Sequence, residues 1–296
     1  MSRIFAGLGF LFWGIRGLGI AILFSYPMLG AAFALPEVNR AALLRFLLFF
    51  CFHVPFGAHI YLINDWSDAR LNPDEPRLRK YQAMKHPEQW GERGVWTLAL
   101  VFLAVALVGF AFLSPVLFAA GVIIAVITNL YSHPRTNFKG VPLLSTCIHF
   151  CFVILYFTGG WGLFAAPTPQ AFALALYFGL VLSAGHYSNE IEDFQSDLRA
   201  GIRTNAIAFG QRRVFRVGLF LFLLSSLYLM VLAGVGWIPP AMAGVGGVLT
   251  LAWVVQIIRF RRWQGGDPIH AFRHFYRILY AGLSLLLVAW LLWEKG

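Results

Sequence analysis

The sequence contains few charged residues. Only 12% of its 296 residues are charged and 59% are hydrophobic, whereas about a quarter of an average soluble domain is charged. A soluble domain of this size could not bury so much apolar surface in one core. The mean hydropathy of +0.71 therefore favours lipid as the surroundings of most of the chain.

Cysteines and long polar tracts are also scarce. The three cysteines lie inside apolar runs without metal-ligand spacing, so neither a disulfide framework nor a zinc site is predicted. The longest polar stretches cover residues 64–94, 189–213 and 259–277, and none is long enough for a soluble domain. We therefore expect one integral membrane domain over residues 1–296.

Apolar runs long enough to span a bilayer recur along the chain. A spanning helix needs about 20 mostly apolar residues. The first run is longer than the apolar part of a usual signal peptide and contains Arg16, so we expect a retained helix. The sequence predicts an all-α, polytopic protein with nine spans, near residues 17–35, 42–63, 95–113, 115–131, 143–163, 171–188, 214–234, 237–258 and 277–293.

The basic residues indicate the orientation of these spans. The net charge of +10 would suggest nucleic acid in a soluble protein, but here Lys and Arg lie in short connections. Of the 23 Lys and Arg residues, 18 follow even-numbered predicted spans, and only Arg40, Arg45 and Lys295 lie on the other side. This bias places the N-terminus and the even connections in the cytoplasm, as in a bacterial inner or plasma membrane protein that binds no nucleic acid.

Two acidic segments follow even-numbered spans. The first reads Asn64-Asp65-Trp66-Ser67-Asp68, and a continuous helix would place Asn64 and Asp68 one turn apart on one face. Asn72 would extend that face, whereas Asp74 and Glu75 follow a proline. The second runs from Asn189 to Asp197. Four-residue spacing aligns three of its residues: Asn189, Asp193 and Asp197.

Most of the acidic residues lie in these two segments. They hold eight of the 13 carboxylates: Asp65, Asp68, Asp74, Glu75, Glu190, Glu192, Asp193 and Asp197. Either segment alone could be a solvated loop, but ionisable groups at the edge of a membrane core are functional by default. Carboxylate and amide oxygens suit Mg²⁺, which favours phosphate oxygens. Two such stripes facing each other predict a metal–diphosphate site.

Cations lie near these acidic segments. Tyr131-Ser132-His133-Pro134-Arg135, with Lys139 downstream, closes the fourth predicted span on the same side. Arg135 and Lys139 could neutralise a diphosphate or could only determine topology. Arg199 and Arg203 have the same two interpretations.

Other polar and small residues have structural interpretations. His186, one turn before Glu190, is expected to be a hydrogen-bonded interior histidine. The Gly246-Gly247 pair has no strand context, so it predicts helix packing rather than a nucleotide loop.

Together these residues resemble the UbiA superfamily of intramembrane prenyltransferases. The first family motif, N-D-x-x-D, matches Asn64, Asp65 and Asp68, with Asn72 where the family carries a further Asp. The second motif is D-x-x-x-D, then G-x-x-T and a later Gly; it matches Asp193, Asp197, Gly201, Thr204 and Gly210. The tyrosine–serine–proline segment with its lysine resembles Tyr131, Ser132, Pro134 and Lys139. The resemblance covers nearly the whole chain.

The resemblance implies a fold, a reaction and roles for residues. We expect a nine-helix bundle with a central cavity open to the cytoplasmic side. Within it, Mg²⁺ would assist transfer of an isoprenyl group from its diphosphate to a lipophilic, aromatic or ring-containing acceptor, with the tail in membrane lipid. The expected metal ligands are Asn64, Asp68, Asp193 and Asp197, supported by Asp65 and Asn189. Tyr131, Arg135, Lys139 and one of Arg199 or Arg203 would stabilise the leaving diphosphate.

Two other functions remain open at this point. A membrane terpene cyclase would use the same scaffold and quench the cation within its own chain. A transporter would carry charges near helix midpoints, whereas these acids lie at helix ends. The sequence leaves open the acceptor, the prenyl length, the oligomeric state and whether Asn72 or Asp74 completes the first motif.

Overall fold

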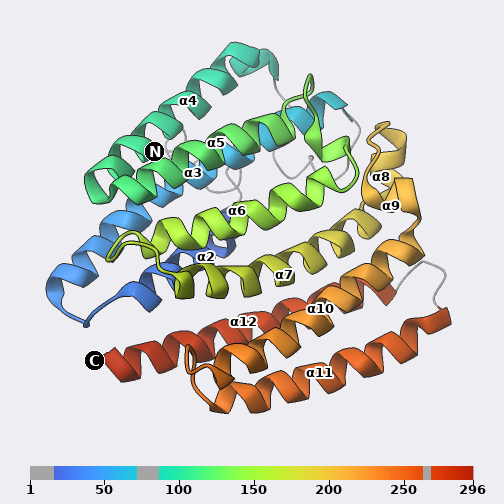
Figure 1. Ribbon diagram of the computed structural model, residues 1–296. Helices are drawn as coiled ribbons and strands as arrows, with labels where there is room; N and C mark the ends of the chain where they lie inside the picture. Colours follow the sequence, from blue (N-terminus) through green and yellow to red (C-terminus); the bar gives the residue numbers. More distant parts are fainter. Residues whose placement is uncertain (1–16, 72–86, 263–267, 296) are drawn as a thin grey trace, which may run out of the picture. The chain divides into compact units, whose positions relative to one another are not determined.

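The computed structural model describes residues 17–71, 87–262 and 268–295. Every regular element in these residues is a helix, as the all-α prediction required (Figure 1). The helices belong to two compact units. The first comprises residues 1–138 and 159–165, and the second comprises residues 139–158 and 166–296. The single domain over residues 1–296 stays a prediction.

The described part of the first unit contains four long helices. They are α2 (Gly17–Ala34), α3 (Arg40–Leu71), α4 (Pro87–Leu113) and α5 (Pro115–Ser132). Ser114 separates α4 from α5, and its hydroxyl accepts from the Leu117 N–H at 3.3 Å. A serine N-cap followed by proline at the first helical position is a strong start signal, so the chain reverses here in one residue.

Aromatic side chains fill the first unit between α3 and α4. Phe56 and Phe110 are almost wholly buried, and their ring centroids lie 5.2 Å apart in an edge-to-face arrangement. Phe49 packs on the same Phe110 ring at 6.1 Å. Such tilted pairs are the favoured geometry of aromatic rings. Many of the phenylalanines that raise the hydropathy of the sequence therefore serve helix packing.

The second unit contains the rest of the described chain, and residues 159–165, between its two parts, belong to the first unit. The core of the second unit includes stacked rings of Phe222 and Trp253, with centroids 4.6 Å apart. Its elements are η3 (Phe138–Gly140, at the unit boundary), α6 (Leu144–Trp161), α7 (Pro169–Glu192), α8 (Phe194–Arg199), α9 (Asn205–Phe209), α10 (Gln211–Gly234), α11 (Ala241–Arg259), η4 (Phe260–Arg262) and α12 (Pro268–Lys295).

The described helices make this an integral, multi-pass membrane protein. Eight of them are long and apolar enough to cross a membrane. The first predicted span coincides with α2, whose apolar segment Leu23–Ala34 is shorter than the other eight. The membrane class is thus confirmed, and the count of nine stays a prediction.

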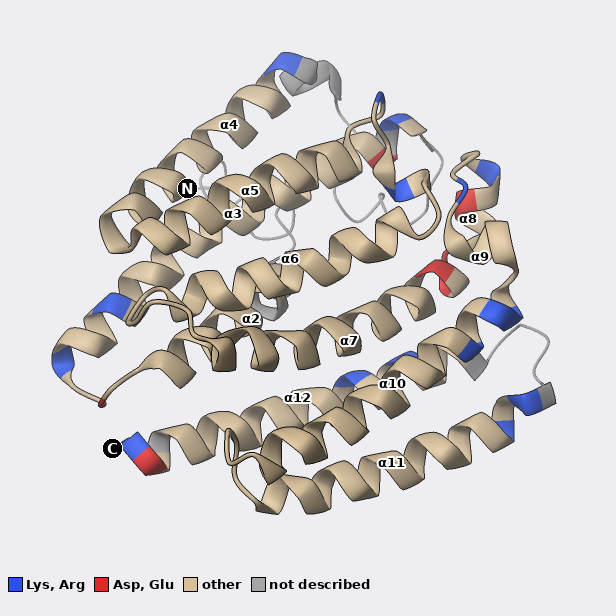
Figure 2. Cartoon of the chain, in the orientation of Figure 1, with Lys and Arg blue, Asp and Glu red and all other residues tan. Residues whose placement is uncertain are grey.

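Several helices extend beyond their predicted apolar windows. α3 continues eight residues past the predicted end at residue 63, and α12 begins nine residues before residue 277. These extensions carry charged residues. In the second unit the charged residues of α7, α10 and α11 lie at one end of each helix (Figure 2). The acidic segments therefore lie mostly on helices and not in loops.

Candidate functional site

The first acidic segment lies on the last turns of α3. Because the helix continues through it, the Asn64 amide nitrogen donates to Asp68 Oδ2 at 3.1 Å, as the four-residue spacing predicted. Both side chains are partly exposed, whereas Asp65 is fully buried. The amide and carboxylate oxygens on this stripe are hard ligands of the kind that Mg²⁺ prefers.

The end of α5 is joined to this stripe. The Ser132 hydroxyl donates to Asn64 Oδ1 at 3.3 Å, and the Ser67 hydroxyl donates to the Ser132 carbonyl. Tyr131 is the next residue, half-buried at the end of α5, and Arg135 is exposed beyond it. The structure therefore brings the tyrosine–serine segment to the first acidic stripe, within the first unit.

The second acidic segment crosses a break between two helices. α7 ends at Glu192 and α8 begins at Phe194, with Asp193 between them at φ −84° and ψ 0°. Two backbone hydrogen bonds nevertheless continue the helical pattern: Asp193 N–H to the Asn189 carbonyl and Asp197 N–H to the Asp193 carbonyl, both 2.9 Å. The predicted four-residue register of Asn189, Asp193 and Asp197 is thus kept across the junction.

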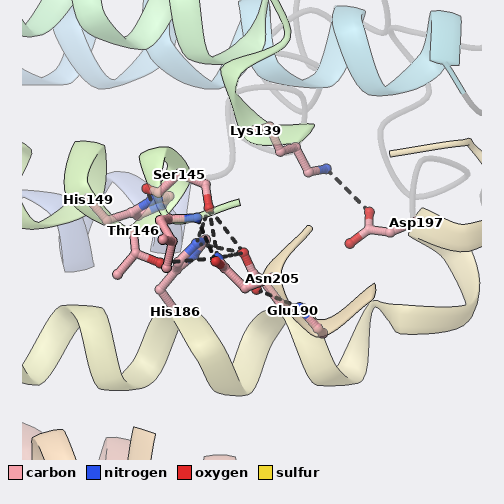
Figure 3. A network of polar contacts seen from close by, with 10 residues as sticks. Lys139, Ser145, Thr146, His149, His186, Glu190, Asp197 and Asn205 are labelled. Carbon is pink, nitrogen blue, oxygen red and sulfur yellow. Dashed lines mark hydrogen bonds and ion pairs between the residues drawn. The ribbon is translucent and has the colours of Figure 1, made fainter. Parts of the chain in front are cut away.

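Lys139 contacts the end of this second stripe. Its Nζ lies 3.7 Å from Asp197 Oδ1 (Figure 3). The Asp197 side chain is 6% exposed and the Lys139 side chain 22% exposed. This is ion-pair distance but longer than a good hydrogen bond. Arg199 and Arg203 are exposed beside the stripe.

Glu190 lies off the stripe and points into the second unit (Figure 3). It is 4% exposed, and its Oε1 lies 2.8 Å from Asn205 Nδ2, 3.1 Å from His186 Nε2 and 3.2 Å from Ser145 Oγ. Its Oε2 accepts from the Ala206 N–H at 3.2 Å. His186 is therefore the hydrogen-bonded interior histidine that we expected.

The sequence did not single out this network. Glu190 counted only as one of the clustered acids, and Asn205 had no role although it follows the Thr204 of the G-x-x-T motif. Spacing identifies residues that share a helix face, whereas these contacts join α6, α7 and α9. An available signal was the polar run Arg203-Thr204-Asn205, directly before the apolar residues 206–209.

α12 supplies further polar contacts to the end of α7. Glu192 forms an ion pair with Arg273 and lies 2.9 Å from Nδ1 of His270. An Arg277 amino group donates to Asn189 Oδ1 at 3.4 Å. Residues 259–277 were predicted to form a polar connection, so these helical partners of the second segment were not predicted.

The profile of the UbiA prenyltransferase family matches residues 21–280 of this chain. The chain belongs to the UbiA prenyltransferase family. The predicted resemblance is confirmed, and membership makes this protein a membrane prenyltransferase, which acts on isoprenyl groups. The match includes both compact units, so both contribute to the family fold.

Solved structures share the fold of this UbiA family member. A UbiA homologue from Archaeoglobus fulgidus bound to DMAPP and Mg²⁺ aligns with a TM-score of 0.73 at 16% identity, over 95% of this chain and 98% of that one. The same homologue bound to GPP and Mg²⁺ aligns at 0.71, also at 16% identity, over 95% and 99%. A digeranylgeranylglyceryl phosphate synthase aligns at 0.74 and 16%, over 96% and 98%. At such identities the likeness shows the fold.

A curated relative is similar over part of the chain. The lycopene elongase/hydratase of Haloferax volcanii is 29% identical over 172 residues, which is 57% of this chain. The match spans about half, 54%, of that relative's own length.

The candidate metal ligands of this UbiA family member are the amide and carboxylate oxygens of the two acidic stripes. Among the described residues, no group of three or more His, Cys, Asp or Glu side chains already surrounds one point. The donor chemistry of each stripe fits Mg²⁺, because every predicted ligand is an amide or carboxylate oxygen. Asn72, Asp74 and Glu75 lie outside the described residues, so the completion of the first motif stays open.

Proposed function

We propose that this protein transfers an isoprenyl group from a Mg²⁺-bound isoprenyl diphosphate to a lipophilic acceptor, aromatic or ring-containing, in the membrane. The observation that carries the proposal is the second stripe: three oxygen-bearing residues kept in register across a helix break, with Lys139 at its end. Ligands of the Archaeoglobus fulgidus homologue, DMAPP and GPP with Mg²⁺, support an isoprenyl diphosphate as the donor.

The proposed metal ligands come from both acidic segments. Asn64, Asp68, Asp193 and Asp197 would hold Mg²⁺, and bound Mg²⁺ would supply Lewis-acid stabilisation of the leaving diphosphate. Asp65 and Asn189 would support these ligands: Asp65 from its buried position, and Asn189 through its bond with Arg277.

The proposed diphosphate contacts are cationic or phenolic. Lys139 already lies beside Asp197, and it would exchange this carboxylate for a phosphate oxygen when the substrate binds. Tyr131 and Arg135 would act from the end of α5, and the exposed Arg199 or Arg203 from the end of α8 and the loop beyond. Cations aimed at the leaving group stabilise the charge that develops as the carbon–oxygen bond breaks. The allylic cation would face aromatic rings, which attract positive charge without reacting.

The acceptor is proposed as a class. Two of the similar proteins are a lycopene elongase/hydratase and a digeranylgeranylglyceryl phosphate synthase, and the lipophilic compounds in these names support a lipophilic acceptor. The eight described helices that are long and apolar enough to cross a membrane place this chain in lipid, where such compounds dissolve. A lipophilic acceptor would reach the site from the bilayer.

Neutralising one ligand in each stripe tests this function. We expect Asp68→Asn and Asp193→Asn each to lower diphosphate release from DMAPP or GPP by roughly 100-fold or more, because charge stabilisation of the leaving group is lost. Release is measured in membranes that contain the native acceptor lipids and Mg²⁺, together with mass spectrometry of prenylated products.

Two acidic residues outside the motifs provide matched controls. Glu37→Gln and Glu294→Gln remove a carboxylate in the first and the second unit, respectively, and should leave release unchanged. Full turnover by folded Asp68→Asn or Asp193→Asn protein would refute the site. A cyclised terpene formed from the diphosphate alone would assign the cyclase reaction instead.

A further inference from the structure

The turn that carries Lys139 has an unusual backbone conformation. Asn137 and Leu143, on either side of Lys139, have φ angles of +42° and +65°. Asparagine tolerates the left-handed region, but leucine there costs about 1–2 kcal/mol. The Leu143 side chain is 57% exposed, so its own packing does not hold it there. A strained residue persists only where its surroundings over-determine it.

Asn205 supplies that restraint. The Leu143 N–H donates to Asn205 Oδ1 at 2.6 Å, and this is a bond from the strained residue itself. Asn205 is fully buried at the start of α9. Its amide nitrogen lies within hydrogen-bond distance of Glu190 Oε1 and, at 3.0 Å, of Ser145 Oγ. One buried side chain thus connects the Lys139 turn, α6 and α7.

Glu190 fixes the orientation of that amide. The groups around its carboxylate can all donate: the Asn205 amide, the Ser145 hydroxyl, the Ala206 N–H and the His186 ring nitrogen. Because the Asn205 NH₂ must point to the carboxylate, its carbonyl oxygen must point to Leu143. A carboxylate that accepts several buried bonds is costly to replace, so the arrangement is rigid.

The same residues are joined to the second stripe. Glu190 lies on α7 between Asn189 and Asp193. On the other side, the Ile202 N–H donates to the Asp197 carbonyl at 2.9 Å, and the Thr204 N–H donates to the Ile202 carbonyl at 3.0 Å. The network therefore connects the Lys139 turn with the Asp197 end of the second stripe through the buried residues Glu190, Asn205 and Thr204.

We infer that Glu190 and Asn205 are positioning residues, which hold the strained Leu143 turn so that Lys139 reaches Asp197 and the diphosphate. This inference rests on the proposed function, because it assigns the diphosphate to Lys139. The inference gives Glu190 a different role from the proposed metal ligands that lie near it in the sequence. If the network only stabilised the fold, its loss would affect every step of the reaction equally, and the effect would not depend on Lys139.

An exchange of polarity tests the pair directly. Glu190→Gln replaces an acceptor oxygen with an NH₂ group that faces other donors, and Asn205→Asp places two carboxylates together, so each should lower diphosphate release by about 10-fold or more. In the double variant the amide introduced on α7 can donate to the carboxylate introduced on α9, which still accepts from the Leu143 N–H. We expect this variant to regain release to within about 3-fold of the parent, since the lost bonds re-form with opposite polarity.

Coupling to Lys139 distinguishes positioning from general stability. Lys139→Gln should lower release by roughly 100-fold, and Glu190→Gln or Asn205→Asp should lower it little further in that background, because they act through the same lysine. Ser225→Ala, which removes a buried hydrogen bond to Tyr280 elsewhere in the second unit, is the control: it should lower thermal stability and leave release unchanged.

Hydrogen exchange gives a readout that does not depend on turnover. Peptides covering residues 139–145 should lose protection in both single variants and recover it in the double variant. Full additivity with Lys139→Gln, or unchanged protection in the single variants, would overturn the inference. A parent that releases no diphosphate, or a Lys139→Gln variant with normal release, would instead refute the proposed function and leave the exchange result standing.

Discussion

Two neighbouring glycines in α11 have opposite surroundings. A Cβ on Gly246 would lie 2.6 Å from the Met230 side chain and 2.9 Å from the Ser226 carbonyl oxygen of α10, whereas a Cβ on Gly247 would meet nothing within 4 Å. The pair was predicted to serve helix packing, and the structure assigns this role to Gly246 alone. Small residues let helix backbones approach closely in a membrane.

Alanine substitutions should separate the two positions. We expect Gly246→Ala to destabilise the protein by about 1–3 kcal/mol, because the carbonyl cannot move without shifting α10. Gly247→Ala should be neutral or stabilising by up to about 1 kcal/mol, as alanine favours the helix. Thermal unfolding in detergent micelles measures both, with Gly247→Ala as the matched control. Equal midpoints for the two variants would contradict the close approach.

Residue spacing predicted the faces of helices but not the contacts between them. The Asn64–Asp68 bond and the register of Asn189, Asp193 and Asp197 follow from a period of 3.6 residues. The Asn205–Leu143 bond joins residues 62 positions apart, and no local pattern encodes it. The roles proposed for individual side chains remain predictions, whereas the faces that carry them are observed.

At the scale of whole helices, α12 is attached to the end of α7 through a partly buried ion pair. The Arg273 side chain is 15% exposed and the Glu192 side chain 26% exposed. His270 adds a second contact to Glu192, and the Tyr276 hydroxyl donates to the Gly185 carbonyl at 3.4 Å. Contacts with α12, which is distant in sequence, thus stabilise the end of α7 that carries the second acidic stripe.

Removal of either charge should loosen this end of α7. Arg273→Gln and Glu192→Gln are each expected to cost about 1–3 kcal/mol, between the values for exposed and buried pairs. The double variant should cost less than the sum of the two. Thermal unfolding of the four proteins gives the coupling, and hydrogen exchange over residues 189–199 localises it.

A surface arginine provides the comparison for this pair. Arg213 is exposed on the first turn of α10, so Arg213→Gln should change the midpoint little. If the two ion-pair variants added without coupling, the contact would not restrain α7.

The apolar segments of the sequence predicted where the long helices lie but not where they begin and end. Hydropathy falls wherever charged residues begin, yet the backbone hydrogen bonds of α3 and α12 continue through them. The break between α7 and α8 was also not predicted: Asp193 keeps a helical conformation, and two i→i−4 hydrogen bonds still cross the junction, so the four-residue spacing of the side chains does not reveal it. Helix ends are where the proposed site residues lie, so the hydropathy pattern is least informative where function is concentrated.

At the scale of the molecule, composition and charge determined most of what was predicted correctly. Low charge and high hydropathy indicated a membrane protein, and the recurring apolar runs correspond to eight long apolar helices. The motifs led to the UbiA family, which the family profile shows. The acceptor was not predictable, because acceptor recognition depends on the shape of a site and leaves no spacing pattern in the sequence.

One apparent exception to the charge asymmetry has a structural explanation. Arg45 lies on the side opposite to most basic residues, and its amino group donates to the Leu113 carbonyl at the end of α4, at 3.0 Å. Its guanidinium also lies 5.7 Å from the centroid of the Phe164 ring. A cation near a helix C-terminus interacts favourably with the last carbonyls. Arg45 therefore serves local packing, and the remaining asymmetry still predicts a cytoplasmic site.

The orientation can be measured with single cysteines at Glu37, Thr136 and Gln195. Among the described residues, five helices long and apolar enough to span the membrane, α3 to α7, lie between Glu37 and Gln195, so these two positions are expected on opposite sides, whether or not α2 also spans. Three such helices separate Glu37 from Thr136. The charge asymmetry predicts that Thr136 and Gln195 face the cytoplasm.

We expect a membrane-impermeant maleimide to label Glu37→Cys in intact cells, and to label Thr136→Cys and Gln195→Cys only after permeabilisation. The background protein has its three native cysteines replaced by alanine and should not react. Labelling of Glu37 and Gln195 from the same side would contradict the helix assignment itself. The reverse pattern would keep the fold but place both acidic stripes outside the cell, where a cytoplasmic isoprenyl diphosphate could not reach them.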